Sequence, residues 1–316
     1  MMRTAIFCAV LAYSPATAAQ DLPPLQPLDT FALEAASSPR ISPSGDHIAY
    51  VRRSNDISRD QTRGSLWMVD FDGRNHLPIA TGENTASSPR WSPSGDRLAY
   101  IANGPEYSAI RMYWMADGRD AEIAQLQGGG GGLSWSPNGS QLAYSAYVLQ
   151  PGVAPAALPA SPPGAEWAES AQVEDRLFYR VDAVGNLPPG SQQLFVVDAQ
   201  GGAPVLITTD DAGASSDFSW TADGTAMIFS ADRRPNSGTA APDSELHRVD
   251  LETGRIRQLT NRIGPDTSPR VSPNGQRIAY TGYDDQRMGY HNTLLYVANA
   301  DGTQARALTL DLDRSV

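Results

Sequence analysis

The sequence contains no lysine, because all 24 of its Lys+Arg residues are arginines. A Walker-type phosphate loop needs a Gly-Lys-Ser/Thr sequence and a Schiff-base enzyme needs a lysine amine, so both classes are excluded. Cysteine is almost absent as well, since Cys8 is the only one. Disulfide frameworks, cysteine-rich zinc sites and Cys-x-x-Cys redox chemistry are therefore excluded too.

Basic residues are also outnumbered, with 35 Asp+Glu against 24 Arg and a formal net charge of −11. This balance argues against a nucleic-acid partner, because neutralising phosphates needs a basic face. The 28 glycines and 24 prolines favour turns and interrupt helices. With 41% hydrophobic residues the chain can still bury a core, so the composition predicts a turn-rich β protein.

The N-terminus has the pattern of an export signal over residues 1–19. Arg3 supplies a positive charge, Thr4–Tyr13 is an apolar run, and small residues follow up to Ala19. A buried N-terminal strand is the alternative, but the three features occur in the order of a signal peptide. The apolar run is too short for a membrane span, which needs about 20 residues. We expect an exported protein, periplasmic or secreted, whose mature chain has no membrane span.

One phrase of the type Ser-Pro-Arg-x-Ser-Pro-Ser-Gly-Asp-x-Ile-Ala-Tyr organises the rest of the chain. Its five copies occupy residues 38–50, 88–100, 133–144, 218–229 and 268–280. Proline presets φ near −65° and glycine supplies the positive φ of a tight reversal, while the flanking apolar runs have strand length. Each copy therefore predicts two strands joined by a tight turn.

A second signal follows each phrase: an apolar strand that ends in an Asp-containing turn, as in Leu66–Gly73, and then a short fourth strand. Four antiparallel strands in each repeat of about 40 to 50 residues are typical of a β-propeller blade. The sequence thus predicts an all-β fold, with a lead-in at residues 20–37 and a propeller at 38–316. The predicted blades are 38–81, 88–126, 133–209, 217–260 and 268–309.

The third repeat is longer than the others. Its anchor Pro137 lies 85 residues before the next anchor, Ala222, whereas the other spacings are 44 to 51 residues. The excess falls between its second and third strands, so we expect an insertion at residues 147–191 and not a sixth blade. The first half of this inserted lobe is rich in Pro and Ala, and the second half mixes charged and aromatic residues.

A search for catalytic motifs finds neither Gly-x-Ser-x-Gly nor His-Glu-x-x-His. The four histidines, the Asp pairs in turns and the repeated tryptophans are interpreted as structural, and we predict no catalytic residue, metal or cofactor. The histidines are His47, His76, His247 and His291. The tryptophans at equivalent repeat positions are Trp91, Trp135 and Trp220.

The inserted lobe holds the candidate site residues. They are Glu166, Glu169, Arg176, Arg180 and Asp182. Arginines beside carboxylates could bind a peptide terminus or hold two parts of a protein together. An ordinary surface ion-pair network is the alternative interpretation.

The lead-in Leu28–Glu34, the Trp167–Arg180 segment and the Tyr283–Tyr290 loop carry a family resemblance. From residue 28 to 316 the chain resembles the N-terminal propeller of the prolyl-oligopeptidase family of serine peptidases, in its acylaminoacyl-peptidase-like or dipeptidyl-peptidase-like branch. The repeated phrase is also similar to that of TolB-type periplasmic propellers.

The resemblance implies a propeller of seven or eight blades that caps a C-terminal α/β-hydrolase domain and admits short peptides. The family's triad lies in that hydrolase domain, so no position here takes a catalytic role. Dipeptidyl members hold the substrate's amino terminus with propeller glutamates, a motif that Glu166 and Glu169 do not match.

Five repeats are fewer than the family has, so the first and fifth blades would each present an unpartnered apolar face. We therefore expect an incomplete propeller from an exported peptidase. The alternative is a self-contained TolB-like scaffold that binds a periplasmic protein partner.

Overall fold

A computed structural model describes residues 24–126, 130–152, 161–167, 173–174, 176–177, 179–182, 185–209 and 212–316. The predicted signal peptide, residues 1–19, lies outside the described residues. One short 3₁₀ helix, η1 (Pro27–Ala32), precedes the first strand. No helix of the described ranges is both long and apolar enough to cross a membrane.

Five four-stranded antiparallel sheets follow in chain order, and we call them blades 1 to 5. Blade 1 contains β1 (Glu34–Ile41), β2 (His47–Asp56), β3 (Gln61–Asp70) and β4 (Leu77–Ala80). Blade 2 contains β5 (Thr85–Trp91), β6 (Arg97–Asn103), β7 (Ser108–Trp114) and β8 (Asp120–Leu126). Blade 3 contains β9 (Gly130–Trp135), β10 (Gln141–Leu149), β13 (Gly190–Asp198) and β14 (Val205–Leu206).

The last two sheets repeat the same order. Blade 4 contains β15 (Phe218–Trp220), β16 (Ala226–Ala231), β17 (Glu245–Asp250) and β18 (Ile256–Gln258). Blade 5 contains β19 (Asp266–Val271), β20 (Arg277–Gly282), β21 (Leu294–Asn299) and β22 (Arg306–Ala307). The predicted all-β fold of four-stranded antiparallel propeller blades is confirmed.

The tight turn that joins the first two strands of each blade has the glycine with positive φ that the sequence predicts. In blade 1 the N–H of Gly45 donates to the carbonyl oxygen of Ser42 at 2.9 Å, and the Ser42 hydroxyl accepts from the N–H of His47 at 3.1 Å. Gly45 has φ +84°, and the equivalent glycines of the other blades have φ +70° to +74°. Glycine is needed there because other residues rarely adopt positive φ.

Blade 3 differs from the prediction in the length of its central strands. Val148 pairs with Ser191, and Leu149 pairs with Gly190. Strands β10 and β13 therefore extend into both ends of the predicted insertion, and the lobe proper is the 150–189 connection. It contains a two-stranded sheet of β11 (Arg180–Val181) and β12 (Gly185–Asn186).

Consecutive blades pack through buried side chains. Four hydrophobic clusters join blades 1 and 2, 2 and 3, 3 and 4, and 4 and 5. The indole N–H groups of Trp91 and Trp135 donate to the carbonyl oxygens of Arg40 and Arg90 in the preceding blades, at 2.9 and 3.0 Å. The prediction that these tryptophans serve packing between repeats is confirmed.

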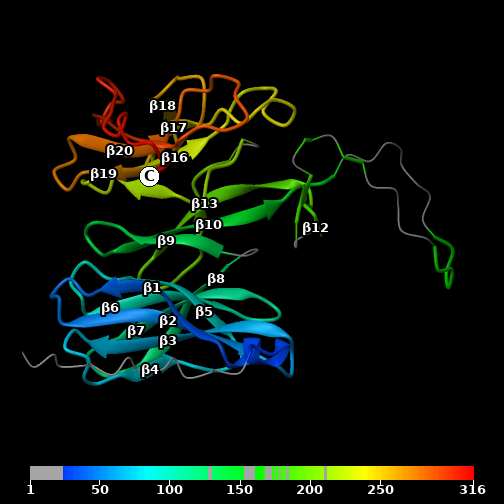
Figure 1. The fold of residues 1–316 in the computed structure, drawn as a ribbon, viewed down its shortest axis with the longest axis vertical. Coiled ribbons are helices and arrows are strands. Elements are labelled where there is room, and N and C mark those ends of the chain that lie inside the picture. The colour runs from blue at the N-terminus through cyan, green and yellow to red at the C-terminus, as the bar shows by residue number, and fades with distance from the viewer. Residues whose placement is uncertain are drawn as a thin grey trace, which may run out of the picture.

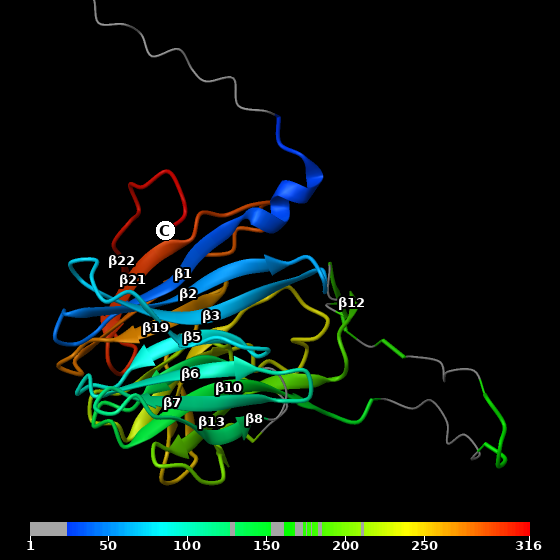
Figure 2. The same ribbon diagram turned by 90° about the horizontal axis from the view of Figure 1, so that it is seen from below.

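The two ends of the blades differ in their connections. At one end, which we call the turn end, lie the tight turns between first and second strands. At the opposite loop end lie the connections between second and third strands: residues 57–60, 104–107, 150–189, 232–244 and 283–293. Blades 1 and 2 occupy one half of the long axis and blades 4 and 5 the other, with blade 3 between them (Figure 1). The lobe and η1 extend on the same side of the sheets (Figure 2).

Candidate functional site

The structure distributes the predicted site residues along the lobe and does not gather them. Glu166, Arg180 and Asp182 are exposed, and among the described side chains none of them has an ion-pair partner. Arg176 is half-buried. Glu169 lies outside the described residues.

Arg176 and its neighbour connect the lobe to the propeller. The Arg176 guanidinium donates from Nη1 to the carbonyl oxygen of Gly190 at 3.1 Å, where β13 begins. The N–H of Leu177 donates to the carbonyl oxygen of Gly238 at 2.8 Å. Since Gly238 belongs to the 232–244 loop of blade 4, the lobe spans from its own blade to the next.

The same loop is fixed by a charged group. Arg234 binds Asp232 from Nη2 at 2.6 Å and Asp243 from Nη1 at 3.2 Å. One guanidinium thus links both ends of the loop, through charge-assisted hydrogen bonds to Asp232 and an ion pair with Asp243. The lobe is thus hydrogen bonded to a loop whose two ends are linked by Arg234.

A buried carboxyl lies beside this loop at the start of β17. The Thr260 hydroxyl donates to Glu245 Oε2 at 2.5 Å and accepts from the N–H of Leu246 at 2.9 Å. Blade 3 has the same arrangement, in which Thr208 donates to Gln193 at 2.5 Å. Glu245 is therefore an ionisable residue at a position where the preceding repeat has a neutral amide.

A second buried carboxyl, Asp266, lies next to it at the start of β19. Arg262 hydrogen bonds Asp266, pairs with Asp284 at 2.8 Å and lies 3.9 Å from the ring centroid of Tyr296. Three buried atoms here have no hydrogen-bond partner among the described residues: Asp266 Oδ2, Arg262 Nε and the hydroxyl of Tyr280.

Burial controls the ionisation of both carboxyls. It raises the pKa of Glu245 to about 7, and the nearby Asp266 and Asp243 add to the shift while Thr260 and Arg262 oppose it. Burial also raises the pKa of Asp266, against the effect of the Arg262 guanidinium. Glu245 can therefore exchange a proton near neutral pH.

Sequence reasoning missed this buried group, although a signal exists. Aligning blades 3 and 4 on their Thr208 and Thr260 positions places Glu245 opposite Gln193. The sequence signal is an acidic residue within a strand. It stands at a repeat position where the neighbouring blade has a neutral residue.

The histidines lie where the sequence analysis expects structural residues. The His47 ring bonds Asp70 at 3.0 Å, His76 bonds the Tyr50 hydroxyl at 2.6 Å, and His291 stacks on Tyr283. His247 stacks on Phe229 within blade 4. Within the described ranges, no group of three or more His, Cys, Asp or Glu side chains could hold a metal ion.

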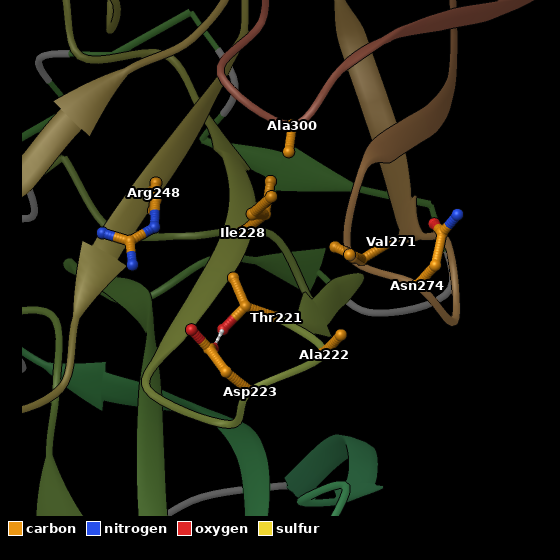
Figure 3. Close-up of a pocket in the computed structure, with 9 residues that line it drawn as sticks. Thr221, Ala222, Asp223, Ile228, Arg248, Val271, Asn274 and Ala300 are labelled. Atoms are coloured by element: carbon orange, nitrogen blue, oxygen red, sulfur yellow. Dashed lines mark hydrogen bonds between the residues drawn. The ribbon is translucent and has the colours of Figure 1, made fainter.

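The turn end also carries a pocket of about 350 Å³ between blades 4 and 5. Figure 3 shows Thr221, Ala222 and Asp223 on one side and Val271 and Asn274 on the other. The Thr221 hydroxyl donates to Asp223 at 2.5 Å. Ala222 stands where the other four turns have proline, so the missing ring accounts for part of this space.

Comparison with known proteins agrees with this architecture. Residues 45–150 match the model of the TolB beta propeller domain. Over 110 residues the chain is 28% identical to the Tol-Pal system protein TolB of Francisella tularensis subsp. tularensis, a match that covers 34% of this chain and 22% of the relative. The chain thus spans about a fifth of the length of the curated relatives that it matches.

Solved structures share the fold at low identity. Acylaminoacyl peptidase of Pyrococcus horikoshii superposes with a TM-score of 0.68 at 16% identity, covering 91% of this chain and 41% of that one. A protein assigned as TolB from Agrobacterium tumefaciens gives a TM-score of 0.53 at 17% identity, covering 87% and 80%. The chain is accordingly a β-propeller with TolB-like repeats, and its fold is shared by TolB and by the propeller part of acylaminoacyl peptidase.

Proposed function

We propose that this chain is the substrate-gating propeller of an exported serine peptidase and contributes no catalytic residue itself. In this proposal a C-terminal α/β-hydrolase domain performs the hydrolysis of oligopeptides or aminoacyl peptides. The propeller restricts access to that domain.

The observation that carries the proposal is the concentration of long connections at the loop end. The 150–189 lobe and the 232–244 and 283–293 loops all lie there, whereas the turn end has the tight turns between first and second strands and third-to-fourth-strand connections of five or six residues. Recognition elements are commonly loops held by a rigid scaffold. The lobe is also hydrogen bonded to the blade 4 loop, which suits a lid that limits the size of an opening.

The likeness to acylaminoacyl peptidase supports the same choice, because it extends over 91% of this chain. Within this proposal Arg176 is a residue that positions the lobe. Glu166, Arg180 and Asp182, which are exposed on the lobe, would contact a peptide or the neighbouring domain.

The reading frame downstream of codon 316 in the source DNA tests the proposal directly. We expect it to continue into a segment with a Gly-x-Ser-x-Gly sequence. A stop codon followed by unrelated sequence would contradict the proposal, and so would hydrolysis of aminoacyl or dipeptidyl nitroanilides by the pure 316-residue chain.

If the frame continues, the gating role can be measured on the longer protein. Arg176→Ala removes a hydrogen bond that anchors the lobe, so we expect faster cleavage of long peptides relative to short ones. Arg306→Ala is the matched control, because Arg306 is exposed on β22, away from the lobe, and forms no ion pair among the described residues. Equal selectivity in the wild type and Arg176→Ala would argue against a gate.

A self-contained scaffold that binds a protein partner is the second candidate, favoured by the TolB match of residues 45–150. It predicts that a photo-crosslinking residue at Tyr290, on the loop end, captures one partner reproducibly in the exporting cell. The same residue placed at Asn274, on the turn end, serves as the control. Absence of any specific adduct at both ends would count against this candidate.

A further inference from the structure

The repeated phrase begins with Ser-Pro-Arg in three of its five copies. The arginines are Arg40, Arg90 and Arg270, which belong to the first strands of blades 1, 2 and 5. Each of them is paired with the alanine of the second strand of its blade. In blades 3 and 4 the same position holds Ser134 and Ser219. The three arginines therefore occupy one equivalent position in three blades.

First strands of neighbouring blades contact one another, β1 with β5, β5 with β9 and β15 with β19. The indole N–H of Trp91 donates to the Arg40 carbonyl oxygen across the first of these contacts. The N–H of Val271 donates to the Ser219 hydroxyl across the last, at 3.1 Å. Because propeller blades surround a central channel, strands that meet in this way lie on its inner side. We call Arg40, Arg90 and Arg270 the central arginines.

The guanidinium groups of the central arginines have the same orientation and converge. In all three, Nη1 donates to the carbonyl oxygen of the proline just before it, at 2.8 Å. Burial lowers the pKa of Arg90 to about 10, and the positive charges of Arg40 and Arg270 add to the shift while Asp217 opposes it. Side chains from blades 1, 2 and 5 thus lie close enough for their charges to interact, although these blades are not all neighbours in the chain.

The backbone before each central arginine has the same unusual conformation. Ser38, Ser88 and Ser268, two residues before the arginines, have φ of +52°, +53° and +52°. Residues other than glycine rarely adopt positive φ. Blade 3 has glycine at this position, Gly132 with φ +61°, and has no arginine after it. Strand bulges redirect side chains, and strained backbone is concentrated at functional sites, so the serines favour a role for the arginines.

Positive charge is in excess around the central arginines. Asp217, which precedes β15, is the carboxylate beside them, and its Oδ1 lies 3.6 Å from Nη2 of Arg270. Its Oδ2 accepts from the Ser268 hydroxyl at 3.0 Å. Arg40 and Arg90 form no ion pair within the described ranges.

The acidic residues within the first strands do not compensate this charge. They are Glu34 and Asp266, which begin β1 and β19 at the loop end, and they pair with Arg52 and Arg262. Three central arginines with one nearby aspartate leave a positive centre in a chain whose formal net charge is −11. Such a centre attracts negatively charged ligands that the rest of the surface repels.

We propose that Arg40, Arg90 and Arg270 bind the carboxylates of an acidic peptide at the centre of the propeller. A guanidinium is planar and forms paired charge-assisted hydrogen bonds with carboxylates. Because the three guanidiniums come from three separate blades, they suit a peptide that carries several carboxylates better than a single small ion.

Calling this peptide a substrate rests on the proposed function, in which peptides pass the propeller on the way to a hydrolase domain. The central arginines then favour peptides with acidic residues. Further blades of a longer propeller would follow blade 5 and leave all three arginines on their first strands. Binding is measured on the 316-residue chain alone, so its failure is distinguishable from a stop codon after codon 316.

Fluorescence anisotropy of labelled pentaglutamate tests the proposal on the purified chain, with labelled pentaglutamine as the neutral comparison. We expect the acidic peptide to bind and the neutral peptide to remain free. The affinity should fall as sodium chloride is added, because salt screens exposed charges. Absence of pentaglutamate binding, or equal binding of the two peptides, would overturn the proposal.

Single variants assign the binding to the central arginines. Arg40→Gln and Arg270→Gln each remove one charge from an exposed side chain, so the fold should persist, as a thermal melt checks. We expect the dissociation constant of pentaglutamate to rise about tenfold or more in each. Arg255→Gln removes the same charge from the exposed turn between β17 and β18 and should bind like the wild type. Unchanged affinity in both central variants, or an equal loss in Arg255→Gln, would contradict the proposed site.

Competition distinguishes a peptide site from a site for a small anion. Unlabelled pentaglutamate should displace the labelled peptide, whereas inorganic phosphate should act no better than sodium chloride of equal ionic strength. Displacement by phosphate at concentrations as low as those of pentaglutamate would identify a site for a small oxyanion and refute the peptide proposal.

Discussion

At the scale of single residues, Glu245 stands out because its side chain is buried, at 8% exposure, and its pKa is raised to about 7. The unfolded chain releases this proton near the ordinary pKa of about 4.3, whereas the folded chain keeps it until about 7. Between these values the native state binds more protons, so its stability falls as pH rises and then levels off above 7.

We therefore predict that Glu245→Gln stabilises the protein at pH 8 by about 1 to 3 kcal/mol and has much less effect at pH 5. The amide oxygen can accept from Thr260 as Gln193 accepts from Thr208 in blade 3. Urea unfolding at both pH values measures the difference. Glu83→Gln, whose side chain is 78% exposed, should leave the pH dependence unchanged, and parallel wild-type and Glu245→Gln curves would show the prediction wrong.

At the scale of the elements, the tight turns form a row in which each glycine approaches the turn before it. A Cβ added to Gly95, Gly139 or Gly224 would lie 3.3 to 3.5 Å from the proline ring of the preceding turn. In the turn before Gly275 the proline is replaced by Ala222, beside the pocket of Figure 3.

We predict that Ala222→Pro stabilises the protein by about 0.4 to 1 kcal/mol, because proline reduces the conformational freedom of the unfolded chain. No hydrogen bond among the described residues uses the Ala222 N–H, so the ring removes none. The free energy of unfolding in urea measures the gain. Pro93→Ala makes the reverse exchange in blade 2 and should cost a similar amount; a loss of stability in Ala222→Pro would contradict the argument.

The elements also show what the sequence can and cannot predict. The turn phrase identifies five blades because Pro and Gly constrain φ locally, and the spacing from Pro137 to Ala222 reveals the lobe. Contacts between segments far apart in the sequence are not marked by a comparable sequence pattern. The pairing of Leu149 with Gly190 lengthens two strands, and the bond from Leu177 to Gly238 joins segments of different blades.

At the scale of the whole molecule, each of the four hydrophobic clusters of the described residues joins two neighbouring blades. In such arrays each unit is held by its own structure and its nearest-neighbour interfaces, so units at the ends are held by one interface and inner units by two. Among the described residues, blade 5 shares a hydrophobic cluster with blade 4 alone, and Leu246 is fully buried in that cluster.

Leu246→Ala should remove about 2 to 5 kcal/mol from that interface, which is enough to let blade 5 open before the other blades. We expect hydrogen exchange to accelerate first in β19–β22 and calorimetry to show a separate transition at lower temperature. Ile110→Ala, at the interface of blades 2 and 3, is the matched variant, and it should divide the molecule into parts of two and three blades instead. If Leu246→Ala still unfolds in one step with uniform exchange, the blades are coupled over a longer range than their contacts indicate.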